Sequence, residues 1–215
     1  MKIKLFCFLC LTLSILSCGN DKKNLPENFD FGQTENNVYS NPYFGLSIKY
    51  PENWTPQSKR NIKAITASGE QILIEDNKPM ASDIKAAQIN TAYLFSLFNQ
   101  PLEKASSYNA SLNVVAENIT AMPHIKRGRD YLLHSKNLLL QSRVPYKFDS
   151  NLDTKEIDGY TFDIMRSTAD FGPYRVKQEF FCIIRYGFSL SFVLSYTNDV
   201  EKQELYNAIN TITLD

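Results

Sequence analysis

The last third of the chain carries the pattern that most restricts its fold. Three segments rich in β-branched and aromatic residues follow one another across short turns: YTFDIMRSTA, YRVKQEFFCIIRY and FSLSFVLSYT. Such segments, joined by short turns, are typical of antiparallel strands, and strict alternation of apolar and polar side chains indicates one buried face. We therefore predict a meander whose last strand has an inner face of Phe188, Leu190, Phe192, Leu194 and Tyr196 and an outer face that includes Ser189, Ser191 and Ser195.

Strand and helix patterns alternate in the region before this meander. In NPYFGLSIKYPENW, Leu46, Ile48 and Tyr50 alternate with polar residues until Pro51, which has no amide hydrogen to donate to a sheet. The other predicted elements are a hairpin over 61–68 and 71–77, a helix from Ser82 to Phe98 closed by Pro101, a strand over Leu112–Asn118, a helix from Ile125 to Gln141, a strand at YKFDS, and a last helix from Asp199 to Asn210 capped by Asn198 and Glu201.

This order of elements indicates the α+β class. Runs of strands with helices between them pack as helices on an antiparallel sheet, here of about six to seven strands.

The expected organisation is a signal peptide over 1–17, a lipidated cysteine and flexible polar tether over 18–40, and a single folded domain over 41–215. The tether has many Asn and few apolar residues, so it buries too little to offset its ordering entropy, and as a coil it would span roughly 25 Å.

The first twenty residues, MKIKLFCFLCLTLSILSCGN, have the features of an export signal. Lys2 and Lys4 precede a run of 12 mostly apolar residues, which is too short to cross a bilayer as a helix. An ordinary signal peptide or an uncleaved anchor would account for these features. The tetrapeptide ILSC, however, resembles the lipobox of bacterial lipoproteins, in which cleavage occurs before a cysteine that has received a diacylglyceryl group. We therefore expect lipid on Cys18, with the signal removed.

Charge and cysteine content exclude several other classes. Loss of the signal leaves 21 basic against 23 acidic side chains, a formal charge of −2, which argues against nucleic-acid binding. Cys182 is then the one unmodified cysteine, so the sequence predicts no disulfide framework. Between Phe181 and Ile183, it is expected to be a buried apolar residue, although a lone exported thiol can also be reactive or form an intermolecular link.

The segments YFGLSIKYPENW, SLNVVAENI and EIDGYTFDIMRS occur in the order found in PsbP-like (PsbP/Mog/DcrB-type) domains, and the chain resembles that family over residues 41–215. The resemblance is one of pattern and order. It implies a central antiparallel sheet with helices on both faces, an α/β/α sandwich. It also implies a domain that binds, assembles or chaperones other proteins, and it transfers no catalytic residue.

Two residue groups were considered as metal or catalytic sites. In DSNLDTKE, Asp149, Asn151 and Asp153 have the spacing of a calcium loop, but Thr154 stands where such a loop needs glycine and Tyr160 where it needs an acid. We interpret this segment as a solvated turn. His124 and His134 are the two histidines, and on one helix they would be about 15 Å apart and could not share a zinc ion. We therefore expect no metal, no cofactor and no catalytic residues.

Four residues are candidate partner contacts. Trp54 is the one tryptophan, and it either fills the core or faces a partner. Lys126, Arg127 and Arg129 stand at the start of the second predicted helix, where the helix dipole disfavours cations. They could contact lipid headgroups or an acidic partner, or simply form the solvated face of the helix.

These observations together predict a monomeric, non-enzymatic lipoprotein of the bacterial cell envelope. We expect it at the outer membrane, facing the periplasm and held there by lipid on Cys18. Its domain would bind another, unidentified protein in the assembly, maintenance or protection of a membrane-associated complex. The alternative is a small-ligand receptor or a hydrolase with a cleft beside the sheet. A binding module would expose an apolar patch on a flat or convex surface, whereas an enzyme would gather titratable groups in a pocket.

Overall fold

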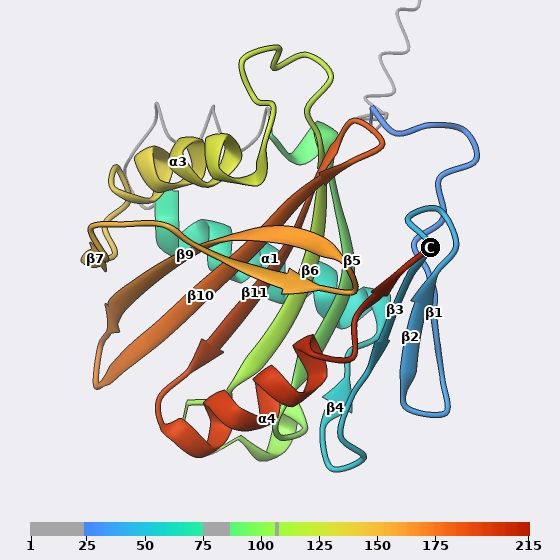
Figure 1. The fold of residues 1–215 in the computed structure, drawn as a ribbon. Coiled ribbons are helices and arrows are strands. Elements are labelled where there is room, and N and C mark those ends of the chain that lie inside the picture. Colours follow the sequence, from blue (N-terminus) through green and yellow to red (C-terminus); the bar gives the residue numbers. More distant parts are fainter. Residues whose placement is uncertain (1–23, 75–86, 106–107) are drawn as a thin grey trace, which may run out of the picture.

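Two antiparallel sheets organise the molecule in the computed structural model, which describes residues 24–74, 87–105 and 108–215 (Figure 1). The larger sheet has eight strands, which in spatial order are β4 (Thr55–Pro56), β5 (Thr91–Phe98), β6 (Ser111–Asn118), β11 (Phe188–Tyr196), β10 (Tyr174–Arg185), β9 (Tyr160–Phe171) and β7 (Tyr146–Phe148), with β8 (Asp153–Ile157) also paired to β9. The smaller sheet has four, in the order β1 (Gln33–Glu35), β2 (Val38–Asn41), β3 (Leu46–Lys49) and β12 (Thr213–Leu214).

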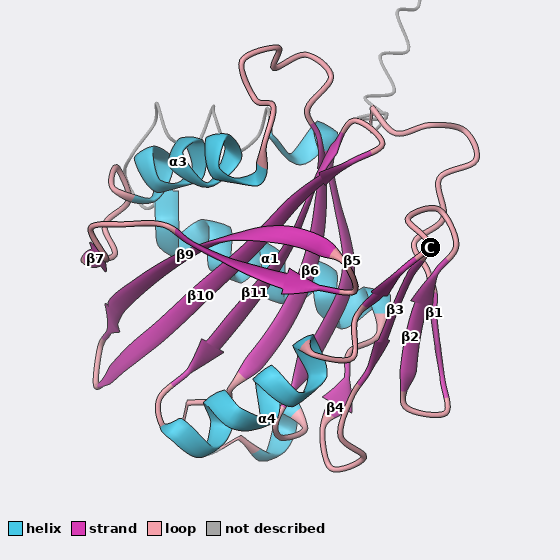
Figure 2. Ribbon diagram, in the orientation of Figure 1, coloured by secondary structure: helices cyan, strands magenta, loops and turns pink. Residues whose placement is uncertain are grey.

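The helices pack around these sheets (Figure 2). They are α1 (Lys59–Ile74), α3 (Gly128–Leu139) and α4 (Asp199–Ile209), with a short 3-10 helix η1 (Leu102–Lys104). The predicted α+β class with an antiparallel sheet is therefore confirmed, and the larger sheet has one or two more strands than expected. Within the described residues, no helix is long and apolar enough to cross a membrane.

Helices cover both faces of the larger sheet. Consecutive residues of a strand point to opposite faces, and in β10 Phe181 packs against Tyr206 of α4 whereas Cys182 packs against Leu132 of α3. Helix α1 lies on the same face as α3. Tyr93 lines a groove with Ile62 of α1, and it belongs to the same cross-strand row as Cys182, which packs against α3. We call these the α4 face, which the smaller sheet also covers, and the α3 face (Figure 1).

The meander has the predicted strands, but its serine side is not a solvent face. Strands β9, β10 and β11 match the three predicted segments, and the register pairs Phe192 with Phe181 and Ser191 with Cys182. Ser189 and Ser191 lie on the α3 face and are buried, at 1% and 7% exposure. The alternation therefore separates two covered faces of different polarity, because α3 packs beside these serines: Tyr131 interacts with Ser189, and Leu132 packs on Cys182, the cross-strand neighbour of Ser191.

Helix α1 replaces the hairpin predicted over 61–77. Ile62 is buried and Ile65 and Thr66 are half-buried, which is the three-to-four-residue spacing of one helix face. The β-branched residues favoured a strand locally, and packing against β5 overrides that preference. Gly69 lies inside the helix with nothing within 4 Å of the position a Cβ would occupy, so it is not a turn residue.

Strand β5 replaces the second half of the helix predicted from Ser82 to Phe98, whereas residues 87–90 are helical as predicted. The segment TAYLFSLF is buried on both faces, with Ala92, Leu94, Phe95 and Leu97 all inside. A short, almost continuous apolar run reads equally well as a buried strand or a helix, and its pairing with β6 decides for the strand. Ser82 lies outside the described residues.

The prediction of a flexible tether through residue 40 is wrong for residues 24–40. Phe29 and Phe31 pack against the main core, and Tyr39 in β2 is 1% exposed and stacks on Phe95 at 4.7 Å between ring centroids. Asn36 and Asn37 have φ of 49° and 58° and form the two-residue turn between β1 and β2. Asparagine tolerates this left-handed geometry, so residues that suggested disorder build a hairpin.

Other predicted elements are confirmed with small shifts. Strand β3 contains the alternating Leu46 and Ile48, and β6 matches the predicted strand over Leu112–Asn118. The side chain of Asn198 caps α4 by accepting from the amides of Val200 and Glu201 at 3.0 Å each. Helix α3 begins at Gly128, three residues later than predicted. Glycine is needed here because a Cβ would lie 2.2 Å from the carbonyl oxygen of Cys182.

Candidate functional site

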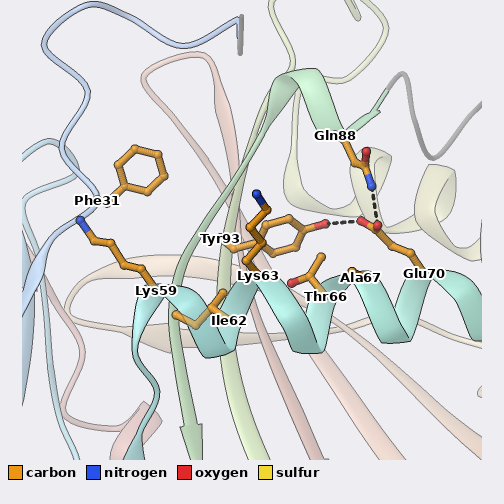
Figure 3. A pocket seen from close by; sticks show the side chains of 9 residues that line it. All are labelled: Phe31, Lys59, Ile62, Lys63, Thr66, Ala67, Glu70, Gln88 and Tyr93. Carbon is orange, nitrogen blue, oxygen red and sulfur yellow. Dashed lines mark hydrogen bonds between the residues drawn. The ribbon is translucent and has the colours of Figure 1, made fainter. Parts of the chain in front are cut away.

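A groove between α1 and β5 forms a cavity with a volume of about 450 Å³ (Figure 3). Phe31 of the N-terminal segment and Ile62 and Ala67 of α1 provide apolar walls. Tyr93 of β5 lies at the floor, on the α3 face of the sheet. The groove therefore exists because residues 24–40 fold onto the domain and because 59–74 form a helix, and both features differ from the sequence-based expectation.

One end of the groove is polar and hydrogen-bonded. Glu70 accepts from the hydroxyl of Tyr93 at 3.1 Å and from the side-chain amide of Gln88 (Figure 3). Burial, and then the charge of Glu70, raise the pKa of Tyr93 well above its ordinary value of 10. Tyr93 is therefore a hydrogen-bond donor rather than a base at physiological pH.

The other end of the groove is cationic. Lys59 and Lys63 line it, and the ammonium of Lys59 lies 5.5 Å from the centre of the Phe31 ring. Helix α1 has no acidic residue in its first turn, and Ser58 Oγ accepts the amide of Asn61 at 3.2 Å as its cap. Together with the apolar walls, these two ammonium groups can bind a ligand that combines an apolar part with an anionic part.

The predicted basic residues line a second, shallower hollow of about 390 Å³ at the start of α3. Lys126, Arg127 and Arg129 are brought together there with Asp163 of β9. Asp163 accepts the backbone amide of Arg129 at 2.8 Å, and Asp130 accepts those of Lys126 and Arg127 at 3.1 and 2.9 Å. Lys126 and Arg127 precede the helix, and these two carboxylates offset the unfavourable position of the cations near its N-terminus.

Trp54 belongs to the core. Its side chain is 3% exposed and its indole nitrogen donates to Glu204 of α4 at 3.2 Å. Of the two alternatives for this residue, the core position is the one observed, and Trp54 is not an exposed partner contact. Cys18, the predicted lipidation site, lies outside the described residues, and its modification stays a prediction.

The two histidines lie closer together than predicted. Their ring centroids are 6.5 Å apart, not about 15 Å, because His124 is in the turn before α3 and folds back toward His134. Tyr131, one turn before His134 on α3, donates to the buried Glu117 at 2.6 Å. Within the described residues, no group of three or more His, Cys, Asp and Glu is placed to hold a metal ion.

Cys182 is buried, as predicted. It is 0% exposed, and burial raises the pKa of its thiol to about 12, so the reactive thiolate does not form near neutral pH. In the DSNLDTKE segment, Asp153 begins β8 and forms an ion pair with Arg166, so the second half of the segment is strand rather than loop. Asp149 and Asn151 lie before it.

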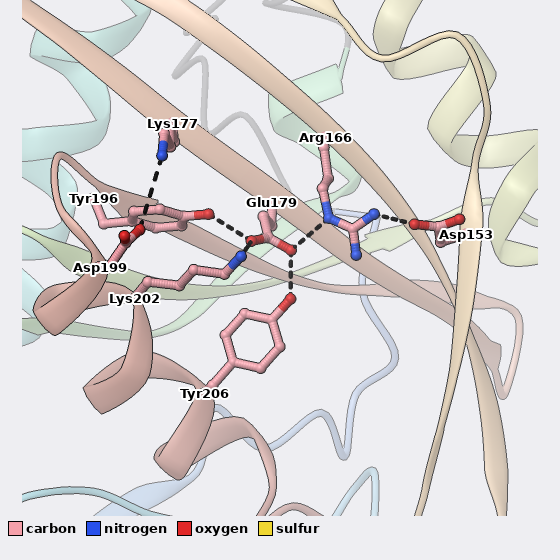
Figure 4. Close-up of polar contacts among 8 residues, drawn as sticks. All are labelled: Asp153, Arg166, Lys177, Glu179, Tyr196, Asp199, Lys202 and Tyr206. Carbon is pink, nitrogen blue, oxygen red and sulfur yellow. Dashed lines mark hydrogen bonds and ion pairs between the residues drawn. The ribbon is translucent and has the colours of Figure 1, made fainter.

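A buried carboxylate under α4, that of Glu179, was not predicted from the sequence. Glu179 of β10 is 1% exposed and accepts from the hydroxyls of Tyr196 and Tyr206, at 2.6 Å each, and from Arg166 at 2.9 Å (Figure 4). Lys202 lies 3.3 Å away. Burial by itself would raise the pKa of Glu179, but the two hydroxyls and the two cations hold it below its ordinary value of 4.5. The group attaches α4 to the sheet.

The sequence contained one signal for Glu179 and little for the groove. Glu179 directly precedes the apolar run FFCII and, at two-residue spacing, shares a strand face with Phe181, and a buried charge needs partners. Glu70 and Tyr93 could have been recognised only after 59–74 was read as helix and 91–98 as strand. Their contact joins residues that are 23 positions apart.

No protein-family model matches the chain, and no curated protein matches it. Among solved structures, the chain is similar to cyanobacterial PsbP (CyanoP) of Synechocystis, at 12% identity and a TM-score of 0.48 over 89% of this chain and 98% of that one. It is also similar to LpqN of Mycobacterium tuberculosis, which is involved in cell envelope biogenesis, at 12% identity and a TM-score of 0.40 over 78% and 83%. A Pseudomonas aeruginosa protein of unknown function, PA94, a putative regulator, has 14% identity and a TM-score of 0.42 over 52% and 77%.

Proposed function

We propose that this chain is a lipid-anchored protein of the bacterial cell envelope whose non-enzymatic domain binds a protein partner through the groove between α1 and β5. The leader sequence with Cys18 supports the anchor. The groove supports the binding role, and it is the single observation on which the proposal depends.

The groove fits a peptide segment that has an apolar side chain next to an acidic one. Phe31, Ile62 and Ala67 offer apolar surface that would be removed from water on binding. Lys59 and Lys63 lie beside that surface, and the internal carboxylate, Glu70, is already hydrogen-bonded. An acidic group on the partner would therefore meet two cations without facing an unpaired acid.

The reactive groups inside the molecule support a non-enzymatic role because they are used in structural contacts. The Cys182 thiol is buried with a raised pKa, and Glu179 accepts from two tyrosines and an arginine that hold α4. Tyr131 and Glu117 similarly join α3 to β6. None of these groups lines the groove.

A second candidate function, a small-ligand receptor, uses the same groove. The cluster of Tyr93, Glu70 and Gln88 favours it, because a few convergent polar groups in an apolar cavity are typical of small-molecule sites. The volume of about 450 Å³ also falls in the range of such sites.

Photo-crosslinking from the groove separates the two candidates. A photoreactive amino acid at Ala67, which lines the groove, should give a protein adduct in intact cells, and the same probe at the exposed Lys104 of η1 should not. The adduct should be lost in a Lys59→Glu, Lys63→Glu variant that melts with the wild type. Equal adducts from both positions would contradict a groove partner. A bound small molecule in native mass spectrometry, without a protein adduct, would instead support the receptor.

The anchor is tested separately. Cys18→Ser should abolish labelling by radioactive fatty acid and leave an unprocessed or released protein, because Cys18 is the one cysteine preceded by a lipobox-like tripeptide, Ile15-Leu16-Ser17. Fractionation of cells with and without the substitution is the measurement. A variant that stays labelled and membrane-bound would show that Cys18 is not the lipidation site.

A further inference from the structure

The short distance along the chain between Cys18 and the folded part restricts how the domain can lie, and this inference rests on the proposed lipid anchor. Asn24, where the described structure begins, is six positions after Cys18 in the chain. Because a chain reaches at most about 3.6 Å per residue, Asn24 lies within roughly 20 Å of the anchored cysteine. A folded chain of this length is about 40 Å across, so the end that holds Asn24 stays near the bilayer.

Asn24 is attached to one particular end of the larger sheet. Its amide donates to the carbonyl of Ile89 at 2.8 Å, and its carbonyl accepts from the side chain of Asn118, the last residue of β6, at 3.0 Å. The next residue, Ile119, donates to the carbonyl of Gly187 in the β10–β11 turn at 3.0 Å. The start of the described chain, the end of β6 and this turn therefore lie at the same end of the molecule (Figure 1).

Exposed cations and an exposed aromatic side chain occur at this end. Residues 119–127 leave β6 toward α3, with Ile125 buried at 4% exposure and Lys126 and Arg127 exposed. Tyr186, in the turn next to Gly187, is 60% exposed. A basic cluster beside an amphipathic ring is the combination that suits the interface of an anionic bilayer.

The carboxylates nearest these cations are already engaged. Asp163 accepts the amide of Arg129, and Asp130 accepts two backbone amides and lies 3.6 Å from Arg127. Among the residues that the structure describes, neither Lys126 nor Arg129 forms an ion pair. Their charge is therefore available to phosphate groups outside the molecule.

We propose that this end of the domain, formed by Asn24, residues 119–127, Arg129 and Tyr186, docks on anionic phospholipid headgroups of the membrane that holds Cys18. The attraction of three cations to such a surface is weak for a protein free in solution. The anchor holds the cations at high local concentration beside the headgroups, so the contact forms and sets the orientation of the domain. The groove beside α1 is a separate surface and stays available to a partner.

The orientation is measurable with single labels on the lipidated full-length protein in vesicles. A dye is attached to Tyr186→Cys at the proposed membrane end, or to Val200→Cys as the matched control. Val200 is 72% exposed and lies beyond the far end of β11, which is roughly 30 Å long. Cys182 is 0% exposed, so it does not compete for the dye. A nitroxide on the lipid headgroups quenches dyes near the surface.

The expected result is several-fold stronger quenching at Tyr186→Cys than at Val200→Cys in vesicles of phosphatidylcholine mixed with phosphatidylglycerol. The difference should shrink in phosphatidylcholine alone and in a Lys126→Glu, Arg127→Glu, Arg129→Glu variant that melts with the wild type. Equal quenching at the two positions in protein that floats with the vesicles would overturn the docking and leave the anchor intact. Protein that does not float would overturn the anchor, and the docking with it. Crosslinking of position 186 to an acidic protein in cells, without quenching of the dye by the labelled lipid, would also overturn the docking on lipid.

Discussion

The two faces of the larger sheet have opposite chemistry although they are built from adjacent residues of the same strands. On the α4 face, one cross-strand row consists of apolar side chains, and on the α3 face the adjacent row consists largely of polar ones. Both rows are covered by helices. The rows are Phe95, Val114, Phe192, Phe181 and Ile164 on the first face, and Tyr93, Val115, Ser191, Cys182 and Asp163 on the second.

Each face also has a buried carboxylate, and the two differ in pKa. On the α4 face, Glu179 has a lowered pKa because two tyrosine hydroxyls, Lys202 and Arg166 outweigh its burial. On the α3 face, Glu117 has a raised pKa because burial outweighs the hydrogen bond from Tyr131 and the nearby His134. The comparison shows that the α4 face is a closed apolar core in which the ionised carboxylate of Glu179 attaches α4 to the sheet. Both candidate surfaces, the groove and the basic hollow, are on the α3 side of the sheet.

The largest expected difference comes from neighbouring residues of β11 that point to opposite faces. Phe192→Ala should lower the free energy of unfolding by about 3–5 kcal/mol, because it leaves a cavity among fully buried apolar side chains. Ser191→Ala should change it by less than about 1 kcal/mol, because its buried hydroxyl has no well-formed hydrogen bond to lose. Urea denaturation of both variants is the measurement. Equal losses would contradict the distinction between the faces.

Removal of the ionised carboxylate of Glu179 should have the next largest effect on stability. Glu179→Gln should lower the free energy of unfolding at neutral pH by roughly 3 kcal/mol, because Arg166 and Lys202 lose their buried counter-charge. The contribution of a carboxylate with a lowered pKa is present above its unfolded pKa, near 4.5, and is lost as the pH falls through the lower folded value. The difference in unfolding free energy between variant and wild type should therefore be constant down to about pH 4.5 and should then decrease as the pH falls further. A gap that widens in acid would refute the assignment.

Tyr131→Phe probes the corresponding contact on the α3 face. It should lower the free energy of unfolding by about 1–2 kcal/mol at neutral pH, because Glu117 loses its hydrogen-bond donor while the ring stays in place. Thermal melts, with the half-buried Tyr146→Phe as control, would measure it. A larger loss than that of Glu179→Gln would invert the proposed order of the two faces.

The smallest effect, and the most specific, is the pH response of Glu117→Gln. A carboxylate with a raised pKa is penalised in the folded state at neutral pH, and the penalty disappears as the pH falls through its folded value toward 4.5. At neutral pH, the variant should equal or slightly exceed the wild type. As the pH falls to about 4.5, the wild type should become more stable relative to the variant. This pH dependence is opposite in sign to the one expected for Glu179, whose pKa is lowered. Denaturation curves of both proteins at several pH values measure this difference. A wild type that becomes less stable relative to Glu117→Gln on acidification would contradict the prediction.

Sequence reasoning succeeded where the local pattern and the tertiary packing agreed. The meander of β9, β10 and β11 and the capped helix α4 were predicted with nearly correct bounds because alternation and capping are local signals. It failed at 59–74 and 91–98, where β-branched residues form a helix and an apolar run forms a strand. The hairpin at Asn36 and Asn37 was missed because its residues also suit a disordered tether.

The candidate sites were predicted only in part for the same reason. Lys126, Arg127 and Arg129 are close in sequence, so one hollow unites them as a local patch. The groove joins Phe31, residues of α1 and Tyr93 of β5, and no sequence spacing brings such distant residues together. The contact of Trp54 with Glu204, 150 positions apart, is equally invisible before the chain folds.

By itself, the sequence determined the α+β class, the C-terminal meander, the buried Cys182 and the strand at Leu46 to Lys49, because period, capping and burial preferences act over a few residues. The tertiary structure decided which polar residues are buried, since Ser189 and Ser191 become interior only when α3 packs on this face of the sheet. It also decided that residues 24–40 are part of the fold, so the folded part reaches to within six positions of Cys18 in the chain. These are consequences of contacts between distant segments, whose energy depends on packing that no local pattern specifies.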